Sequence, residues 1–162
     1  MSGPKNAGVK KRAAGRHSKA TATAGRRSSL DSTPPLEGLS DYAQEARNLA
    51  MAPFSNFKVG AALLTVDGEI ITGCNIESAT YGLTLCAERV AAFKAVSEGF
   101  RKFSAIAVVT DSRPVAPPCG SCRQVLWELC GDIWVHIADI RGNKKTMRLS
   151  TLLPEPFDKR FL

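Results

Sequence analysis

The sequence predicts an α/β fold, a three-layer α/β/α sandwich on a mixed sheet, and three observations point to it. Helical and strand-like segments alternate along residues 36–162 in the order α-β-β-α-β-α-β-β, which is typical of a sheet with helices packed on it. Residues 104–109 (Ser-Ala-Ile-Ala-Val-Val) are almost continuously apolar, as expected of a strand covered on both faces. Asp67-Gly68 stands between two strand-like runs and predicts a tight hairpin, so part of the sheet is antiparallel.

The first 35 residues differ in composition from the rest. Residues 1–30 hold eight of the 22 Lys and Arg residues and no acid, which leaves 14 basic and all 15 acidic side chains for the remainder. We therefore predict a disordered basic tail at residues 1–35 and a folded domain at residues 36–162. The folded part is close to neutral, so its charge does not indicate a nucleic-acid-binding domain. For the tail, a solvated extension, organelle targeting and polyanion binding all stay open.

The composition shows no feature of a membrane or secreted protein. No apolar run approaches the ~18 residues of a membrane span, and no apolar stretch follows the basic N-terminus. Five cysteines are an odd number, and three have the spacing of metal ligands, which favours a reducing compartment. We therefore expect a cytoplasmic protein without a membrane anchor.

The first half of the folded part predicts one helix and a hairpin. Residues 40–51 have a helical pattern with Ser40 as N-cap, an apolar side that includes Tyr42 and Leu49, and Pro53 beyond its end. Residues 57–65 and 69–74 then predict the two strands of the hairpin, followed by a polar loop at residues 75–82.

The second half predicts two central helices and three strands. Residues 86–97 are mostly apolar and predict a buried helix that ends at Gly99. Strands are expected at 103–110, 132–140 and 145–149, a second helix at 119–129, and a short docking segment at 152–157.

Two short motifs carry the chemistry of the chain. Cys86-Ala87-Glu88 and the Cys119–Cys122 pair supply three thiols and one carboxylate. Thiolates suit Zn²⁺, three of them leave a fourth position open for water, and Glu88 could then handle protons. On residue types alone, a redox pair, inert buried thiols and a structural zinc site with Cys74 as fourth ligand remain alternatives.

Both motifs lie where the chain enters a predicted helix. The partial positive charge of a helix N-terminus favours thiolates. Residues i and i+2 diverge by about 200° on a helix, so Cys86 must lie at or before the first turn if it shares a site with Glu88. Arg89 and Arg123 each follow a motif directly and could donate hydrogen bonds to the metal-binding sulfurs; surface positions are the alternative.

Four segments closely resemble the small, homotetrameric cytidine deaminases, and the likeness extends over roughly residues 38–157. They are Ser55–Leu63 (SNFKVGAAL), Gly73–Glu77 (GCNIE), Cys86–Arg89 (CAER) and Pro118–Gln124 (PCGSCRQ). One departure is Phe54, where the family often has Tyr. The resemblance implies a cytidine-deaminase-like catalytic domain that forms a homotetramer with active sites shared between subunits.

The resemblance also implies the reaction and the residues that perform it. Cytidine and deoxycytidine would be hydrolysed to uridine and deoxyuridine with release of ammonia, as in pyrimidine salvage. Cys86, Cys119 and Cys122 would bind one Zn²⁺ per subunit, and Glu88 would shuttle protons for the hydroxide that the zinc supplies.

Six further residues would contact the nucleoside: Phe57, Asn75, Glu77, Ala79, Tyr81 and Phe157. The family likeness implies that the Asn and Glu bind the ribose 3′-hydroxyl and that the two Phe pack around the pyrimidine, Phe157 from across a subunit interface. The Ala and Tyr would approach the ligand of a neighbouring subunit. A carboxylate beside the sugar repels phosphate, which favours free nucleosides over nucleotides.

Two rival functions remain at this point. The first is a deaminase of the same fold that acts on an aminonucleoside antibiotic of the blasticidin type. The second is a non-catalytic, zinc-stabilised protein that holds RNA with its basic tail, whose binding would depend strongly on salt.

Overall fold

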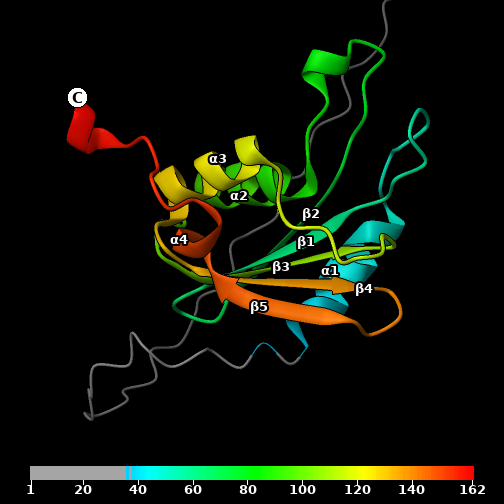
Figure 1. Cartoon of the computed structure of the whole chain (residues 1–162), viewed down its shortest axis with the longest axis horizontal. Coiled ribbons are helices and arrows are strands. Elements are labelled where there is room, and N and C mark those ends of the chain that lie inside the picture. Colours follow the sequence, from blue (N-terminus) through cyan, green and yellow to red (C-terminus); the bar gives the residue numbers. More distant parts are fainter. Residues whose placement is uncertain (1–35, 37) are drawn as a thin grey trace, which may run out of the picture. The chain divides into compact units, whose positions relative to one another are not determined.

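The computed structural model describes residue 36 and residues 38–162, so the predicted tail at residues 1–35 lies outside the described part of the chain. The described residues form a five-stranded sheet in the order β2-β1-β3-β4-β5. Helices cover both of its faces, with α2 and α3 together on one of them (Figure 1). The predicted three-layer α/β/α sandwich is therefore confirmed. The elements are α1 (Leu39–Asn48), β1 (Gly60–Thr65), β2 (Ile70–Cys74), η1 (Tyr81–Leu83), α2 (Ala87–Ser97), β3 (Phe103–Thr110), α3 (Gly120–Cys130), β4 (Trp134–Asp139), β5 (Lys144–Arg148), α4 (Leu149–Leu152) and η2 (Lys159–Phe161).

The sheet is mixed, as the sequence predicts. Strand β1 is antiparallel to both β2 and β3, and β5 is antiparallel to β4. The hairpin at Asp67-Gly68 forms, with the Thr65 N–H donating to the Glu69 carbonyl at 2.9 Å. Strands β3 and β4 are parallel, so the chain crosses between them through α3. This crossover brings the start of α3 to the face of the sheet that carries α2.

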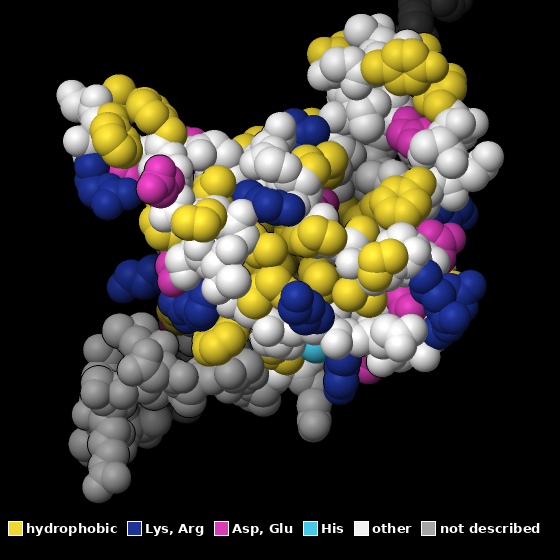
Figure 2. Space-filling view, in the orientation of Figure 1, with side chains coloured by type: hydrophobic (Ala, Val, Ile, Leu, Met, Phe, Trp, Pro, Cys, Tyr) yellow, Lys and Arg dark blue, Asp and Glu magenta, His cyan; other side chains and the backbone are white. Residues whose placement is uncertain are grey.

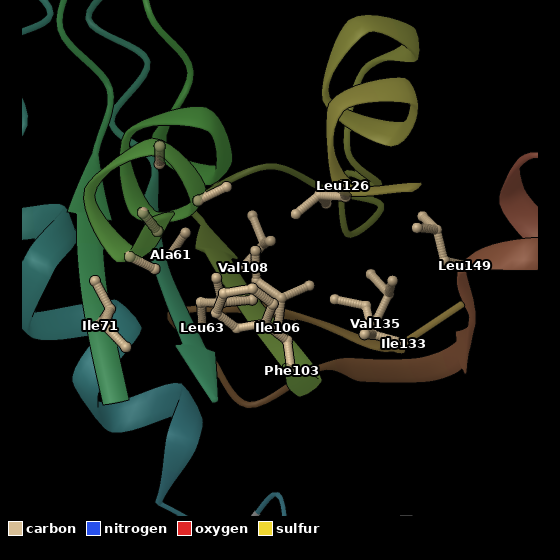
Figure 3. Packing of buried hydrophobic residues seen from close by; sticks show 14 of the residues in the cluster. Ala61, Leu63, Ile71, Phe103, Ile106, Val108, Leu126, Ile133, Val135 and Leu149 are labelled. Atoms are coloured by element: carbon tan, nitrogen blue, oxygen red, sulfur yellow. The ribbon is translucent and has the colours of Figure 1, made fainter. Parts of the chain in front are cut away.

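The two faces of the sheet hold cores of different composition. Between the sheet and helices α2 and α3, large side chains such as Leu63, Ile106 and Leu126 are fully buried (Figure 3). On the other face, small residues such as Ala62 and Ala107 allow α1 to lie close to the strands. The apolar area removed from water on each face, at about 25 cal/mol per Å², holds the layers together.

Helix α1 differs from its prediction in start, end and orientation. It begins at Leu39 with Gly38 as N-cap, so Ser40 lies inside the first turn and its hydroxyl caps nothing. Leu39 is buried, whereas Tyr42 and Leu49, placed by the sequence on the apolar side, are exposed. The helical period alone does not determine which face of α1 packs on the sheet. That face is determined by the fit of the helix to the surface of the strands.

The segment between α1 and β1 is longer than predicted. Helix α1 ends at Asn48 because the chain turns to pair with the loop after β2: the Met51 N–H donates to Asn75 O at 3.0 Å, and Met51 O accepts from Glu77 N at 2.8 Å. Strand β1 begins at Gly60, three residues later than predicted. Part of the polar backbone of residues 57–59 is bound by side chains instead of a neighbouring strand.

The remaining predicted helices and strands lie within two residues of their predicted bounds. Three short helices were not predicted: η1, η2 and α4, which ends where the predicted docking segment at residues 152–157 begins. No helix among the described residues is long and apolar enough to cross a membrane.

Candidate metal and catalytic site

The first turns of α2 and α3 carry the three thiols. Cys86 is the N-cap of α2 and Cys119 is the N-cap of α3, both with extended backbones, and Cys122 lies in the first turn of α3. The predicted constraint is thereby satisfied, since Cys86 precedes the first helical turn and can share a site with Glu88. Both helices direct their positive ends toward the sulfurs, which favours the thiolate form.

The spacing of the sulfurs fits one zinc ion. The three Sγ atoms lie within 4.8 Å of one another, and those of Cys86 and Cys119 are 3.9 Å apart. Zn–S bonds of about 2.3 Å at tetrahedral angles place sulfurs about 3.8 Å apart. In the described part of the chain no other cluster of His, Cys, Asp or Glu has such spacing, and Cys74 is not part of this one. Three ligands without a fourth are typical of a catalytic zinc site and argue against the structural alternative.

Arg89 supports the sulfur cluster. Its Nη2 donates to the Thr84 carbonyl at 2.9 Å and to Cys86 Sγ at 3.8 Å. The pKa of Cys86 falls to about 5, mainly because the Cys122 thiol donates to its sulfur, with Arg89 as a further cause. The same pairing raises the pKa of Cys122. Cys86 is therefore negatively charged at neutral pH, whereas Cys122 keeps a proton that a bound cation would displace.

Arg123 lies differently from the expectation. Its guanidinium donates to two backbone carbonyls, Pro118 O at 2.7 Å and Leu152 O at 3.0 Å, and no bond to a sulfur is found in the described structure. The side chain therefore ties the residue before Cys119 to the C-terminal segment instead of contacting the metal ligands.

Glu88 is the buried carboxylate of the site. It lies in the first turn of α2 and only 4% of its surface is exposed. Burial raises the pKa of Glu88 to about 7, and the charge of Cys86 adds to this. A carboxyl group with a pKa near the working pH can both accept and donate a proton.

A cavity of about 320 Å³ lies beside the loop that follows β2. It is lined by Phe54, Ser55, Glu77, Tyr81 and Thr84. Glu77 accepts hydrogen bonds from the backbone N–H groups of Phe54 (2.8 Å) and Ser55 (3.2 Å) and from the Ser55 hydroxyl. These bonds keep the pKa of Glu77 below its ordinary value, so its carboxylate is negative at neutral pH. Two of the predicted substrate residues, Glu77 and Tyr81, are thus brought together.

The Asn75 side chain binds backbone groups and has further hydrogen-bonding capacity for a ligand. Its side chain is 7% exposed, its Nδ2 donates to Phe57 O at 2.8 Å, and its Oδ1 accepts from Val59 N at 2.8 Å. One N–H and one lone pair of the amide are left for a sugar hydroxyl.

The other predicted substrate residues are not in the cavity. Phe57 and Ala79 are exposed, and Phe157 is more than half exposed and stacked on Phe161. The peptide carbonyl of Phe157 accepts a hydrogen bond from Gln124 at 2.6 Å, which anchors this segment to α3. Figure 2 shows hydrophobic side chains at the tips of two projections, which Figure 1 identifies as the η1 loop and the C-terminal segment.

Sequence reasoning missed the residues that support the site. Ser55 was not singled out, although it bonds Glu77, and the role of Arg47 depends on contacts far along the chain. Gly73 did carry a signal, because glycine inside a strand often marks a close approach of another backbone. A Cβ at Gly73 would lie 2.5 Å from Ala91 N of α2.

Comparison with known proteins agrees with this geometry. Residues 35–137 match the family model of the cytidine and deoxycytidylate deaminase zinc-binding region. A cytidine deaminase of Halalkalibacterium halodurans is 53% identical over 116 residues, which cover 71% of this chain and 88% of the relative. A cytidine deaminase of Sporosarcina psychrophila is 47% identical over 128 residues, covering 78% and 94%. The crystal structure of a cytidine deaminase from Burkholderia pseudomallei is similar with a TM-score of 0.73 at 46% identity and covers 75% of this chain and 98% of that one. The chain belongs to the cytidine deaminase family.

Proposed function

We propose that this chain hydrolyses cytidine and deoxycytidine to uridine and deoxyuridine with release of ammonia, as a step of pyrimidine salvage. One observation carries the proposal: a nearly fully buried carboxylate, Glu88, stands in the helical turn that follows a metal ligand, beside three sulfurs spaced for one zinc ion. That arrangement suits the activation of water against an amino-substituted ring carbon.

The residues of the chain divide the work between them. The thiolates of Cys86, Cys119 and Cys122 would hold zinc, which would make a bound water acidic enough to lose its proton near neutral pH. Glu88 accepts that proton on its carboxylate and delivers it to N3 of the cytosine ring. The oxygen of that water bonds to C4 of the ring, and Glu88 then moves the proton of the new C4 hydroxyl to the exocyclic nitrogen. The C4–N bond breaks, ammonia leaves and the C4 carbonyl of uridine forms. Burial keeps Glu88 away from bulk water, so protons pass between carboxylate and substrate.

Substrate selection is proposed to follow from Glu77, which lines the small cavity, and from Asn75 and Phe57, which lie outside its lining. Glu77 and Asn75 are proposed to bind the ribose 3′-hydroxyl, and Phe57 to pack on the pyrimidine. The Glu77 carboxylate stays ionised, so a phosphate on the sugar would be repelled. Free nucleosides are therefore the proposed substrates.

A substrate panel tests this proposal. Ammonia release is measured for cytidine, deoxycytidine, dCMP, adenosine and a blasticidin-type aminonucleoside, each with and without a zinc chelator. Turnover of the two cytosine nucleosides that is lost on chelation supports the proposal. Turnover of the antibiotic alone supports the first rival function, and salt-sensitive RNA binding without any ammonia release supports the second.

The subunit is proposed to assemble into a homotetramer with shared active sites. Four exposed side chains on the two projections support this: Tyr81 (76% exposed), Leu83 (69%), Phe157 (57%) and Phe161 (65%). Exposed apolar groups of this size are typical of an interaction surface. In the assembly Phe157 would pack around the pyrimidine of a neighbouring subunit, and Ala79 and Tyr81 would approach its ligand. Light scattering coupled to gel filtration measures the mass, and a monomer that is fully active would contradict the shared site.

The compartment and the tail are also matters of proposal. All five cysteines are free thiols, which supports function in the reducing cytoplasm. Residues 36–162 are proposed to form the catalytic domain. Removal of residues 1–35 should leave kcat and KM for cytidine unchanged, and a large loss of turnover would show that the tail contributes to catalysis.

A further inference from the structure

Residues 57–59 form an irregular segment before β1 that carries Phe57, one of the residues proposed to contact the nucleoside. Its backbone is bound largely by side chains: Asn75 contacts Phe57 O and Val59 N, each at 2.8 Å, and Arg47 donates to Lys58 O at 3.0 Å. Because the segment precedes β1, its conformation depends on these few bonds. The placement of the Phe57 ring therefore depends on Arg47 and Asn75, together with Ser55, whose Oγ accepts from Phe57 N at 3.0 Å.

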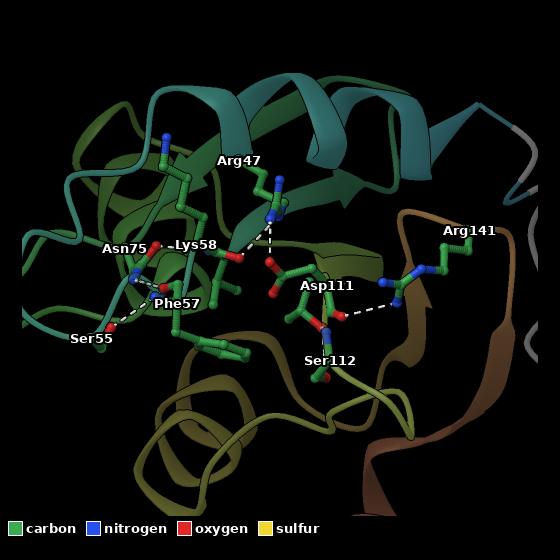
Figure 4. A network of polar contacts seen from close by, with 10 residues as sticks. Arg47, Ser55, Phe57, Lys58, Asn75, Asp111, Ser112 and Arg141 are labelled. Carbon is green, nitrogen blue, oxygen red and sulfur yellow. Dashed lines mark hydrogen bonds and ion pairs between the residues drawn. The ribbon is translucent and has the colours of Figure 1, made fainter.

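Arg47 reaches this segment from the last turn of α1. Its Nε donates to Lys58 O at 3.0 Å while its Nη2 pairs with Asp111 Oδ2 at 3.0 Å (Figure 4). The Arg47 side chain is only 13% exposed, so the ion pair is partly shielded from water. Asp111 directly follows β3, which belongs to the centre of the sheet. The rigid guanidinium thus connects the Phe57 segment to the sheet through two bonds made at once.

The attachment of α1 to the sheet does not need this side chain. Leu39 and Ala43 of the helix are buried against the strands. Gly60 allows the two backbones to touch, since a Cβ there would lie 1.9 Å from Ala43 O. The Arg47 guanidinium is therefore available to hold the segment, and the Phe57 ring points away from it, on the other side of that segment (Figure 4).

We propose that Arg47, paired with Asp111, is a positioning residue that sets the Phe57 wall of the nucleoside site. The inference rests on the proposed function and adds a determinant of substrate affinity to it. Arg47 touches neither the sulfurs nor Glu88 in the described structure, so its loss should affect binding more than chemistry.

The test compares Arg47→Met and Arg47→Lys with the matched control Arg141→Met. Arg141 is exposed and donates only to the backbone carbonyl of Asp111, at 3.4 Å, through its side chain. For Arg47→Met we expect KM for cytidine to rise about tenfold, because one charge-assisted hydrogen bond is lost. The kcat should stay within about threefold of that of the unmodified enzyme. Zinc content should stay at one ion per subunit. For Arg47→Lys the KM should stay raised, because one ammonium cannot reach both acceptors that the guanidinium fork binds.

Hydrogen exchange provides a readout that needs no activity. The amides of residues 57–59 should exchange faster in Arg47→Met, whereas those at the centre of β1 and all amides of Arg141→Met should not. The proposal would be overturned if Arg47→Met had a KM within twofold of that of the unmodified enzyme, or lost only kcat. It would also be overturned if Arg47→Lys restored KM, or if Arg141→Met raised KM as much as Arg47→Met. If the unmodified protein deaminates no nucleoside, the proposed function fails, and the exchange experiment still decides whether Arg47 holds this segment.

Discussion

Replacing Gly73 with Ala should move the helix that carries the catalytic carboxylate. Gly73 lies in β2 under the start of α2, and an added Cβ would lie 2.5 Å from Ala91 N and 2.6 Å from Ala87 O. Both are backbone atoms, so no side chain can rotate away. Restoring van der Waals separations of about 3.5 Å needs a helix shift of roughly 1 Å. Overpacking of this kind costs about 1–3 kcal/mol.

The expected consequences are separable in two assays. A loss of about 2 kcal/mol should lower the melting temperature by roughly 8 °C for a domain of this size. A shift of about 1 Å in a catalytic group should lower kcat/KM for cytidine about 100-fold. Gly82→Ala is the control, because nothing lies within 4 Å of its added Cβ, and it should melt like the original protein. If Gly73→Ala keeps its melting temperature and activity, the close approach of β2 does not determine the position of α2.

Three more predictions concern the site and the acid stability of the fold. Glu88→Gln should retain zinc and lose about 10²–10⁴-fold in kcat, because the amide cannot carry protons; metal analysis beside a cytidine assay checks both, and near-normal turnover would contradict the assigned role. Cys122→Ala should lose zinc and activity together, and chelation of zinc from the original enzyme should lower its melting temperature; an active, metal-free preparation would contradict the site. Hydrogen bonds from the Asn143 side chain and the backbone N–H groups of Arg141 and Asn143 hold the pKa of Asp139 below its ordinary value, with Arg113 as a smaller cause. A carboxyl group whose pKa is lower in the folded than in the unfolded state stabilises the fold at pH values above its unfolded pKa. This contribution of Asp139 should be lost as the pH falls below about 4. Asp139→Asn should therefore flatten the acid side of a plot of folding stability against pH.

The metal site could be predicted from the sequence because its chemistry is local. Cys86 and Glu88 are two residues apart, and Cys119 and Cys122 are three apart, so each pair is necessarily close in space. Only the distance between the two pairs depends on the three-dimensional fold. The apolar run at residues 104–109 predicted a strand covered on both faces. The structure adds that this strand, β3, is parallel to β4 and joined to it through α3, which brings α3 beside α2.

The features that could not be predicted depend on residues far apart in the sequence. The start of β1 is set by Arg47 and Asn75, which bind the segment before it from outside the strand. Arg89 and Arg123 follow their motifs in the same way, yet only Arg89 contacts a sulfur. The guanidinium of Arg123 donates to Leu152 O, 29 residues away along the chain. No local sequence pattern predicts that hydrogen bond.

The different environments of Glu88 and Arg89 explain how one helical turn serves both the metal and the proton. Neighbouring residues diverge by about 100° around a helix axis, so the two side chains leave α2 in different directions. Arg89 turns back to Thr84 O and Cys86 Sγ, where its charge offsets that of the thiolates. Glu88 forms no ion pair within the described residues, and Arg89 is the least of the influences on its pKa. Had Arg89 paired with Glu88, the carboxyl would stay ionised at neutral pH and would be a poor proton donor to a leaving amino group. The order Cys-Ala-Glu-Arg therefore allows the Arg89 guanidinium to offset the charge of the sulfurs, while the Glu88 carboxyl can still exchange its proton.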